Sequence, residues 1–281
     1  MSTTLAVAGG PRAFSYGGGT QSTAALVLAA EGHLDFQTFL FANVGEDSEF
    51  PATLRYLRQF AMPFAEMHGI ELVEVRKRTR DGTPQTLLER IDASPRSIPI
   101  PVRMGPGGAP GNRTCTAEFK IRVIEKELRR RGAAKDAKAI VGIGISTDDP
   151  GRVGSEVDHR TPYQLRRYPL IEAGLSRADC QRVIQAAGLP LPPRSACWFC
   201  PFHSAEEWRR LARREPSLFE KACRLEDKMH ARGEALGRGE FYFTRYRVPL
   251  RDLFHGNELL LFDEEDPLGL EAGCDSGHCM T

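Results

Sequence analysis

The feature that most constrains the fold is a run of glycines between a short apolar segment and a helix-forming segment. Ala13 and Phe14 precede glycines 17–19, and Ser22 then begins an alanine- and leucine-rich run typical of a helix. In such a strand–turn–helix unit, glycine lets backbone N–H groups approach an anion at the helix N-terminus. The segment therefore predicts a phosphate-binding loop, the alternative being a tight turn without a ligand. It lacks the lysine of a G-x-x-x-x-G-K-[ST] loop and the spacing of G-x-G-x-x-G.

The same alternation of strands and helices continues through the first half of the chain. Buried strands are expected at 36–42, 71–75 and 139–145, and helices at 51–68 and 116–131. Shorter helices are expected after Thr83 and Pro84, and after the capping pairs Ser176 with Asp179 and Ser204 with Glu207. The predicted fold is α/β: a Rossmann-like, doubly wound, mostly parallel sheet with a helical, cysteine-containing C-terminal extension.

This organisation predicts two domains. Residues 1–170 form a nucleotide-binding α/β domain, and residues 171–281 form the extension. Within the first domain, a proline- and glycine-rich segment, 93–112, is expected to be a long loop without regular structure.

Composition narrows the classes of function. With 41% hydrophobic residues, the 281-residue chain can bury a substantial core. Its 38 basic and 37 acidic residues exclude a uniformly polycationic nucleic-acid coat, but not a local basic groove. No apolar run reaches the roughly 20 residues that cross a bilayer, and no basic region precedes the apolar start. We expect a cytoplasmic protein with no membrane partner. In that reducing compartment, its seven cysteines are expected to bind metal, react or lie buried, instead of pairing as disulfides.

The chemistry-bearing cysteines fall into three segments. Cys197 and Cys200 form a C-x-x-C pair, and its spacing lets two thiolates hold one metal. Cys115 lies at the start of a predicted helix, whose dipole is expected to lower the pKa of its thiol. Cys274 and Cys279 lie in the C-terminal tail. Either Cys115 joins the C-x-x-C pair, or the tail cysteines complete a four-thiolate site that Zn²⁺ would suit, or two thiols simply pack against Trp198. Cys180 and Cys223 are expected to be structural.

The glycine loop resembles the S-G-G-x-D-S signature of the PP-loop ATP pyrophosphatase superfamily, in the branch related to phosphoadenosine phosphosulfate (PAPS) reductase and to DNA-phosphorothioation sulfurtransferases. Segments 41–46, 113–120, 142–152, 168–170 and 193–201 agree with that branch in order. The resemblance implies that ATP binds to Ser15, Tyr16, Gly17, Gly18, Gly19, Thr20, Gln21 and Ser22, with its adenine near Ala42, Asn43, Val44 and Glu46. It also implies that ATP is split between its α and β phosphates.

The resemblance implies further site residues and cofactors. Gln21 replaces the acidic residue of the signature, so Mg²⁺ is expected to use Glu46, Asp148 or Asp149. Cys115, Asp148, Asp149 and Arg152 are the candidate catalytic residues. Cys115, Cys197 and Cys200 would hold a [4Fe-4S] cluster with one open iron, as in cluster-dependent thiolases of this superfamily. The alternative metal is Zn²⁺, with Cys274 and Cys279 as ligands.

The resulting hypothesis is an ATP-dependent sulfurtransferase that adenylylates a nucleic acid, a nucleotide or a small metabolite and inserts sulfur from a persulfide or cluster. A cysteine desulfurase would be a fitting sulfur-donor partner. One alternative is a PAPS-reductase-like enzyme whose catalytic cysteine is Cys274 or Cys279. Another is a non-catalytic subunit that binds nucleotide or nucleic acid. Around the expected site, Arg160, Arg166 and Arg167 are candidates to line its mouth, and Asp158 and His159 to transfer protons.

Overall fold

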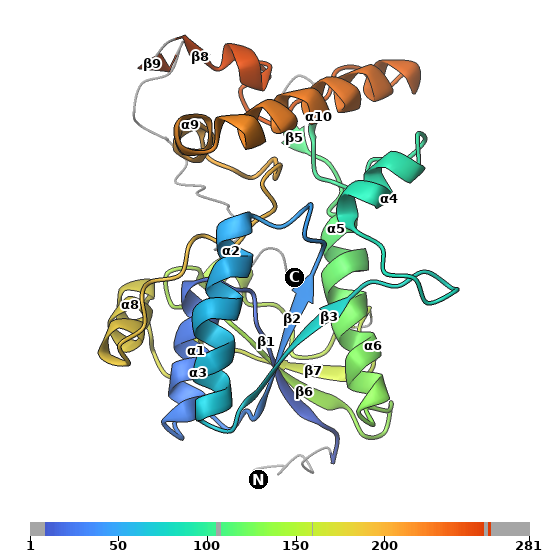
Figure 1. Cartoon of the computed structure of the whole chain (residues 1–281). Helices are drawn as coiled ribbons and strands as arrows, with labels where there is room; N and C mark the ends of the chain where they lie inside the picture. The colour runs from blue at the N-terminus through green and yellow to red at the C-terminus, as the bar shows by residue number, and fades with distance from the viewer. Residues whose placement is uncertain (1–8, 105–107, 159, 256–257, 260–281) are drawn as a thin grey trace.

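A computed structural model describes residues 9–104, 108–158, 160–255 and 258–259. Its centre is a five-stranded sheet in the order β3-β2-β1-β6-β7, in which every neighbouring pair is parallel (Figure 1). These strands are β1 (Arg12–Ser15), β2 (Thr38–Asn43), β3 (Glu71–Arg76), β6 (Ala139–Ile143) and β7 (Gln164–Arg167). The Rossmann-like α/β prediction is confirmed. β7 was not expected from the sequence, which indicated mostly helix after residue 145.

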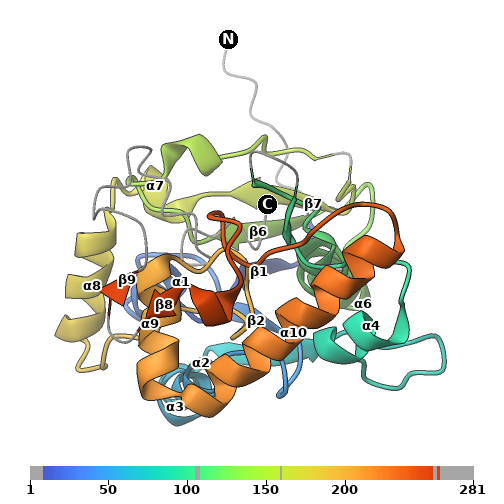
Figure 2. The ribbon, with the colours of Figure 1, turned by 90° about the horizontal axis from the view of Figure 1, so that it is seen from above.

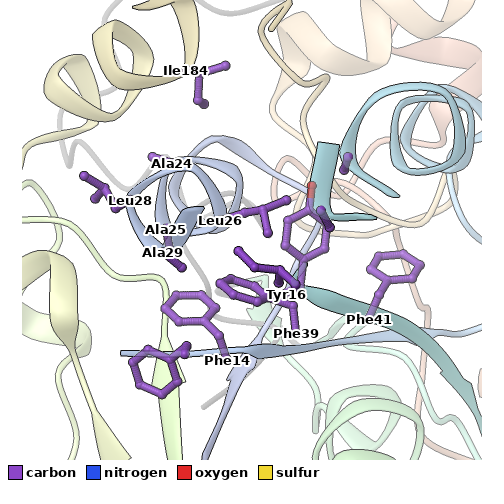
Figure 3. Close-up of a cluster of buried hydrophobic side chains, with 14 of the residues drawn as sticks. Phe14, Tyr16, Ala24, Ala25, Leu26, Leu28, Ala29, Phe39, Phe41 and Ile184 are labelled. Atoms are coloured by element: carbon purple, nitrogen blue, oxygen red, sulfur yellow. The ribbon is translucent and has the colours of Figure 1, made fainter. Parts of the chain in front are cut away.

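Helices cover both faces of this sheet, and their positions follow from the alternation of side chains along β1 and β2. Phe14 and Phe39 face α1 (Thr20–Ala30), as Figure 3 shows. The same cluster includes residues of α2 (Pro51–Tyr56), the π-helical turn η1 (Leu57–Ala61), α7 (Pro169–Glu172) and α8 (Arg177–Ala186). Ala13 and Leu40, one residue out of phase, face α6 (Arg122–Arg130) instead.

The predicted helices form, with local differences. Residues 51–67 are helical throughout, and η1 precedes α3 (Met62–Met67), which has Pro63 in its first turn. The predicted helix at 116–131 begins earlier, as α5 (Thr114–Thr116) and η2 (Ala117–Ile121), and continues into α6. α4 (Leu87–Ala93) is capped by Thr86 through a capping box with Glu89, so the expected cap at Thr83 is wrong.

A second group of elements lies beyond the carboxyl ends of the strands (Figures 1 and 2). It contains α9 (Ala205–Arg214) and α10 (Pro216–Ala235), and Ser204 with Glu207 caps α9 as expected. Phe119, Trp198, Trp208, Phe241 and Phe243 share its buried cluster. Segment 93–112 is largely irregular, but it contains β4 (Arg103–Met104) and β5 (Ala109–Pro110), which pair as a hairpin.

The remaining described elements are short. They are the 3₁₀ turns η3 (Pro150–Arg152) and η4 (Leu250–Asp252) and the strands β8 (Phe254–His255) and β9 (Glu258–Leu259). The predicted boundary after residue 170 stays a prediction, and α8, on its far side, packs against α1 in the core of the sheet. No helix in the described part of the chain is long and apolar enough to span a membrane.

Candidate functional site

The glycine loop joins β1 to α1 at the carboxyl end of the central strand. β1 lies between β2 and β6, so the loop occupies the point where the strand order reverses, which is where open α/β sheets bind ligands. Gly18 has a φ of +80°, and a Cβ there would lie 3.0 Å from Thr53 Cγ2 and 3.3 Å from Phe41 Cε2. Glycine is therefore required both by the backbone conformation and by the close approach of its neighbours.

The start of α1 is held by its own residues. The Gly19 N–H donates to Ser22 Oγ at 3.2 Å, and Ser22 Oγ donates to the Gly19 carbonyl at 3.0 Å. Tyr16 turns its side chain into the core, where its hydroxyl lies 2.9 Å from Thr23 Oγ1 and burial raises its pKa. Any contact of Tyr16 with a nucleotide would therefore come from its backbone.

The loop is connected to the predicted catalytic acids across the strand-order reversal. Gln21 Nε2 lies 3.5 Å from Ser146 Oγ, which donates to Asp148 Oδ2 at 3.0 Å. The backbone N–H of Arg177 also donates to Asp148 and lowers the pKa of this carboxyl group. The ionised carboxylate of Asp148 is thus connected through the Ser146 hydroxyl to Gln21, whose amide stands where the resembled signature has an acidic residue. Asp149 instead forms salt bridges with Arg152 at 3.2 Å and Arg177 at 3.7 Å.

The predicted adenine region ends in a charged network. Asn43 Nδ2 donates to Glu74 at 2.7 Å and to Glu46 at 3.2 Å. Glu46 also pairs with Arg58 and Arg76, each at 2.5 Å, and the hydrogen bond from Arg58 is the main reason that its pKa falls to about 2. Because two arginines already neutralise Glu46, Asp148 has the better placed charge for Mg²⁺.

Three of the predicted cysteines line one small cavity. Its volume is about 30 Å³, and it is bordered by Val44, Leu87, Pro101, Arg113, Cys115, Thr116, Lys120, Cys197, Cys200 and Phe202. The fold thus brings Cys115, near the start of the long helix, beside the C-x-x-C pair 82 positions further on. Cys180 and Cys223 lie elsewhere, buried in α8 and α10, as expected of structural residues.

Burial decides the ionisation of these thiols. It raises the pKa of Cys115, raises that of Cys200 to about 11, and places that of Cys197 well above its ordinary value. The expected lowering at Cys115 is therefore wrong. Although α5 continues through η2 into α6, desolvation of the thiolate costs more than Lys120 and Arg113 restore.

A buried lysine, Lys120, and a buried glutamate, Glu49, lie beside the cavity. Burial by itself lowers the pKa of Lys120, but Glu49 and the three cysteines together raise it. Glu49 is fully buried and has a raised pKa, again through burial; Lys120 and a backbone N–H of Val44 oppose the rise. Neither carboxylate oxygen of Glu49 has a hydrogen bond of ordinary geometry within the described residues. The sequence does not single out Lys120 or Glu49 as site residues, because nothing in their local pattern indicates burial.

The C-x-x-C segment is docked between the glycine loop and the turn after β2. Ser195 Oγ donates to the carbonyl of Gly17. Two residues on, the backbone of Cys197 is bridged to that of Glu49, flanked by bonds from Phe50 N–H to Ala196 O at 3.0 Å and from Trp198 N–H to Ser48 O at 3.3 Å. The thiols are therefore held beside the predicted phosphate loop by contacts on both sides.

The donor set suits a thiolate-bound metal or cluster. Three thiols line one cavity with two cations, Lys120 and Arg113, whose charge would offset that of bound thiolates. The three sulfurs do not yet close on a single point: no group of three His, Cys, Asp or Glu side chains in the described ranges forms a ready metal site. Cys115, Cys197 and Cys200 would hold the group. Cys274 and Cys279 lie outside the described residues, so the four-thiolate alternative stays a prediction.

Two further expectations concerned the segment after β6. Arg166 does not line a site mouth: it lies buried on β7 and pairs with Asp158 at 2.5 Å. Asp158 also binds Arg160, mainly by a side-chain hydrogen bond that lowers its pKa, so this carboxylate is neutralised by two arginines. Arg167 is exposed and pairs with Glu172 at 2.9 Å. His159 lies outside the described residues.

Solved structures include chains that are similar to this one. The chain is similar to U34-tRNA thiolase NcsA from Methanococcus maripaludis, which was solved with its [4Fe-4S] cluster. The two share 15% identity with a TM-score of 0.43, over 85% of this chain and 76% of that one. No family model matches the chain, and no curated protein matches it. At this identity and TM-score we draw no conclusion about chemistry from the likeness.

Proposed function

We propose that this protein is an ATP-dependent sulfurtransferase of the PP-loop kind. One observation carries the proposal: the segment with Cys197 and Cys200 is anchored to the glycine loop by the hydrogen bond from Ser195 to Gly17, and it meets Cys115 in one cavity. Sulfur chemistry and nucleotide chemistry would therefore meet at the carboxyl edge of the sheet. A metal site or a nucleotide site alone would not need this docking.

In the proposed reaction, an oxygen of the substrate attacks the α-phosphorus of ATP, and pyrophosphate leaves. A sulfur nucleophile then forms a bond to the activated centre, and AMP leaves with the former substrate oxygen. Backbone N–H groups of residues 17–19 and the α1 N-terminus would bind the phosphates. Asp148 would supply the carboxylate for Mg²⁺ that Gln21 cannot. A cluster or metal held by Cys115, Cys197 and Cys200 would supply a site that carries sulfide.

The first test is metal content after anaerobic purification of the full chain. We expect iron with a visible absorption band, or else zinc, and we expect each of Cys115→Ser, Cys197→Ser and Cys200→Ser to lose it. Cys223→Ser is the matched control, because Cys223 is buried but far from the cavity, and it should retain the metal. If the protein contains neither iron nor zinc, or if the cavity variants retain their metal, the cysteine assignment is wrong.

The second test is pyrophosphate release from ATP with Mg²⁺, sulfide and either bulk tRNA or DNA oligonucleotides, with the product examined for sulfur by mass spectrometry. Release that depends on Asp148 and yields a thiolated product supports the sulfurtransferase. Reduction of PAPS without pyrophosphate release would support the reductase alternative. ATP binding with no turnover of any substrate would support the non-catalytic alternative, and either result would overturn our proposal.

A further inference from the structure

A large basic groove runs along the edge of the sheet, away from the glycine loop. Its volume is about 1240 Å³, and it lies between the edge strand β3 and the helix α6, which are neighbours in Figure 1. Eight basic side chains line it against three acidic ones. Its walls thus have a strong positive excess in a chain whose net charge is only +1.

The acidic residues of the groove neutralise only some of its cations, and Glu74 pairs with Arg76 at 3.2 Å. Glu118 pairs with Lys77 at 2.5 Å, and Glu127 is bound by Arg130 and Arg131. Within the described residues, no salt bridge engages Arg122, Lys126 or Lys135, and all three are exposed. A nearby carboxylate, that of Glu125, is close enough to Arg122 and Arg129 to feel their charge but forms no ion pair with them.

The arrangement of these cations is regular. Arg122, Lys126 and Arg130 follow one another at four-residue intervals, so they lie along one face of α6, opposite the buried Ile124 and Leu128. Tyr163, which directly precedes β7, also lines the groove, with the Arg129 guanidinium 4.4 Å from the centre of its ring. A row of cations with an aromatic ring beside it is the chemistry that binds a phosphodiester backbone.

Protection of the sheet edge does not account for this row. Charged side chains on an edge strand prevent pairing with another sheet, which would explain Arg76 and Arg78 on and after β3. It would not explain Arg122, Lys126 and Lys135, which belong to the helix and the turn after it.

One end of the groove adjoins the proposed active site. Glu118 lines the groove and follows Cys115 by three residues on the same helical segment. Lys77 lies 4.3 Å from the ring centre of Phe119, which is buried in the cluster that packs against the cysteines. Arg76 reaches from the groove to Glu46 at 2.5 Å. A strand bound along α6 would thus lead towards both the cysteine cavity and the nucleotide region.

We propose that the groove between β3 and α6 binds the phosphodiester backbone of a nucleic acid, which makes nucleic acid the substrate class of this enzyme. That the nucleic acid is a substrate rests on the proposed function. That the groove binds nucleic acid does not depend on it. Contacts to a backbone carry little base information, so we expect binding that depends on salt more than on sequence.

The test is fluorescence anisotropy with a labelled RNA hairpin, a single-stranded DNA and a DNA duplex, each titrated with the full chain at several salt concentrations. The variant is Arg122→Gln/Lys126→Gln/Lys135→Gln. We expect roughly tenfold weaker binding at 0.15 M salt, and a slope of log affinity against log salt that is smaller by about three. The three probes distinguish RNA from DNA and single strand from duplex.

The matched control is Arg213→Gln/Arg214→Gln/Lys221→Gln, which removes the same charge from exposed positions on α9 and α10. It should bind almost as the unmodified protein does. The proposal is overturned if no probe binds, if the groove variant binds normally, or if the control weakens binding equally. Nucleic-acid binding without pyrophosphate release would reject the proposed function but not the proposal that the groove binds nucleic acid. Failure of the proposed function and failure of the groove proposal are therefore distinguishable.

Discussion

The glycine loop and the cysteine cavity lie side by side but are built in opposite ways. One contiguous stretch makes the loop, and its polar groups satisfy one another, as between Gly19 and Ser22. Five separate segments make the cavity, and beside it a buried carboxylate, Glu49, has no hydrogen bond of ordinary geometry among the described residues. The loop thus satisfies its own polar groups, whereas the cavity holds two cations, Lys120 and Arg113, whose charge bound thiolates would help to neutralise.

The largest expected effect comes from removing the buried cation beside the cavity. Lys120→Met leaves Glu49 buried without its counter-charge, so we expect the free energy of unfolding to fall by about 3–5 kcal/mol. Urea denaturation measures this loss. Lys126→Met, which is exposed on α6, is the control and should change stability by less than about 0.5 kcal/mol.

A double variant sharpens this result. Glu49→Gln/Lys120→Met removes both charges, so it should be more stable than the sum of the two single losses predicts. Additive losses would show that Glu49 and Lys120 do not interact, and the assignment of Lys120 as the counter-charge of Glu49 would then be wrong.

A second buried carboxylate, that of Glu226, allows the effect of burial on charge to be tested through the pH dependence of stability. Glu226 on α10 accepts backbone hydrogen bonds from Phe243 and Leu250, both at 2.6 Å, yet burial still raises its pKa to about 7. A carboxyl group with a raised pKa stabilises the fold in its protonated form. Its contribution is complete below the unfolded value of about 4.5 and is lost as the pH rises through 7.

The variant Glu226→Gln removes this titration. Between pH 5 and pH 8, the unmodified protein should lose roughly 2 kcal/mol of stability that the variant does not lose. Thermal or urea unfolding of both proteins at the two pH values measures the difference. Parallel pH profiles would show that the two hydrogen bonds keep Glu226 ionised, and that hydrogen bonding, more than burial, sets the charge of carboxylates in this region.

The sequence predicted local features better than features of the assembled fold. The parallel sheet, the glycine loop and the capping boxes of α8 and α9 depend on spacing within short segments, and the structure confirms them. β7 was missed because its four residues, Gln164–Arg167, are polar or charged apart from one leucine; its partner Asp158 is what permits Arg166 to be buried there. The cap of α4 was available as Thr86 with Glu89, but the adjacent threonine–proline pair gave a competing signal.

The cavity could be predicted only in part. Cysteine is a residue type that indicates metal binding or reactivity, so the sequence predicts Cys115 and the C-x-x-C pair as site residues. Their neighbours Lys120 and Glu49 have the sequence pattern of ordinary surface charges. Burial of those two residues is a property of the assembled fold, as is the desolvation that reversed the expected pKa shift of Cys115. Local spacing carries no information about either.

An alanine substitution in the glycine loop should have the smallest of these effects on stability and the most selective effect on ATP binding. Gly18 and Gly32 have almost the same left-handed φ, +80° and +78°, so an alanine at either costs about 1 kcal/mol in backbone strain. Around Gly32 nothing lies within 4 Å of an added Cβ, whereas at Gly18 it meets Thr53 and Phe41. We therefore expect Gly18→Ala to lose somewhat more stability than Gly32→Ala, and Gly18→Ala alone to bind ATP roughly tenfold more weakly in calorimetry. Because strain is matched between the two, a normal affinity in Gly18→Ala would mean that the shape of this loop does not determine nucleotide binding, and the first half of the comparison would be wrong.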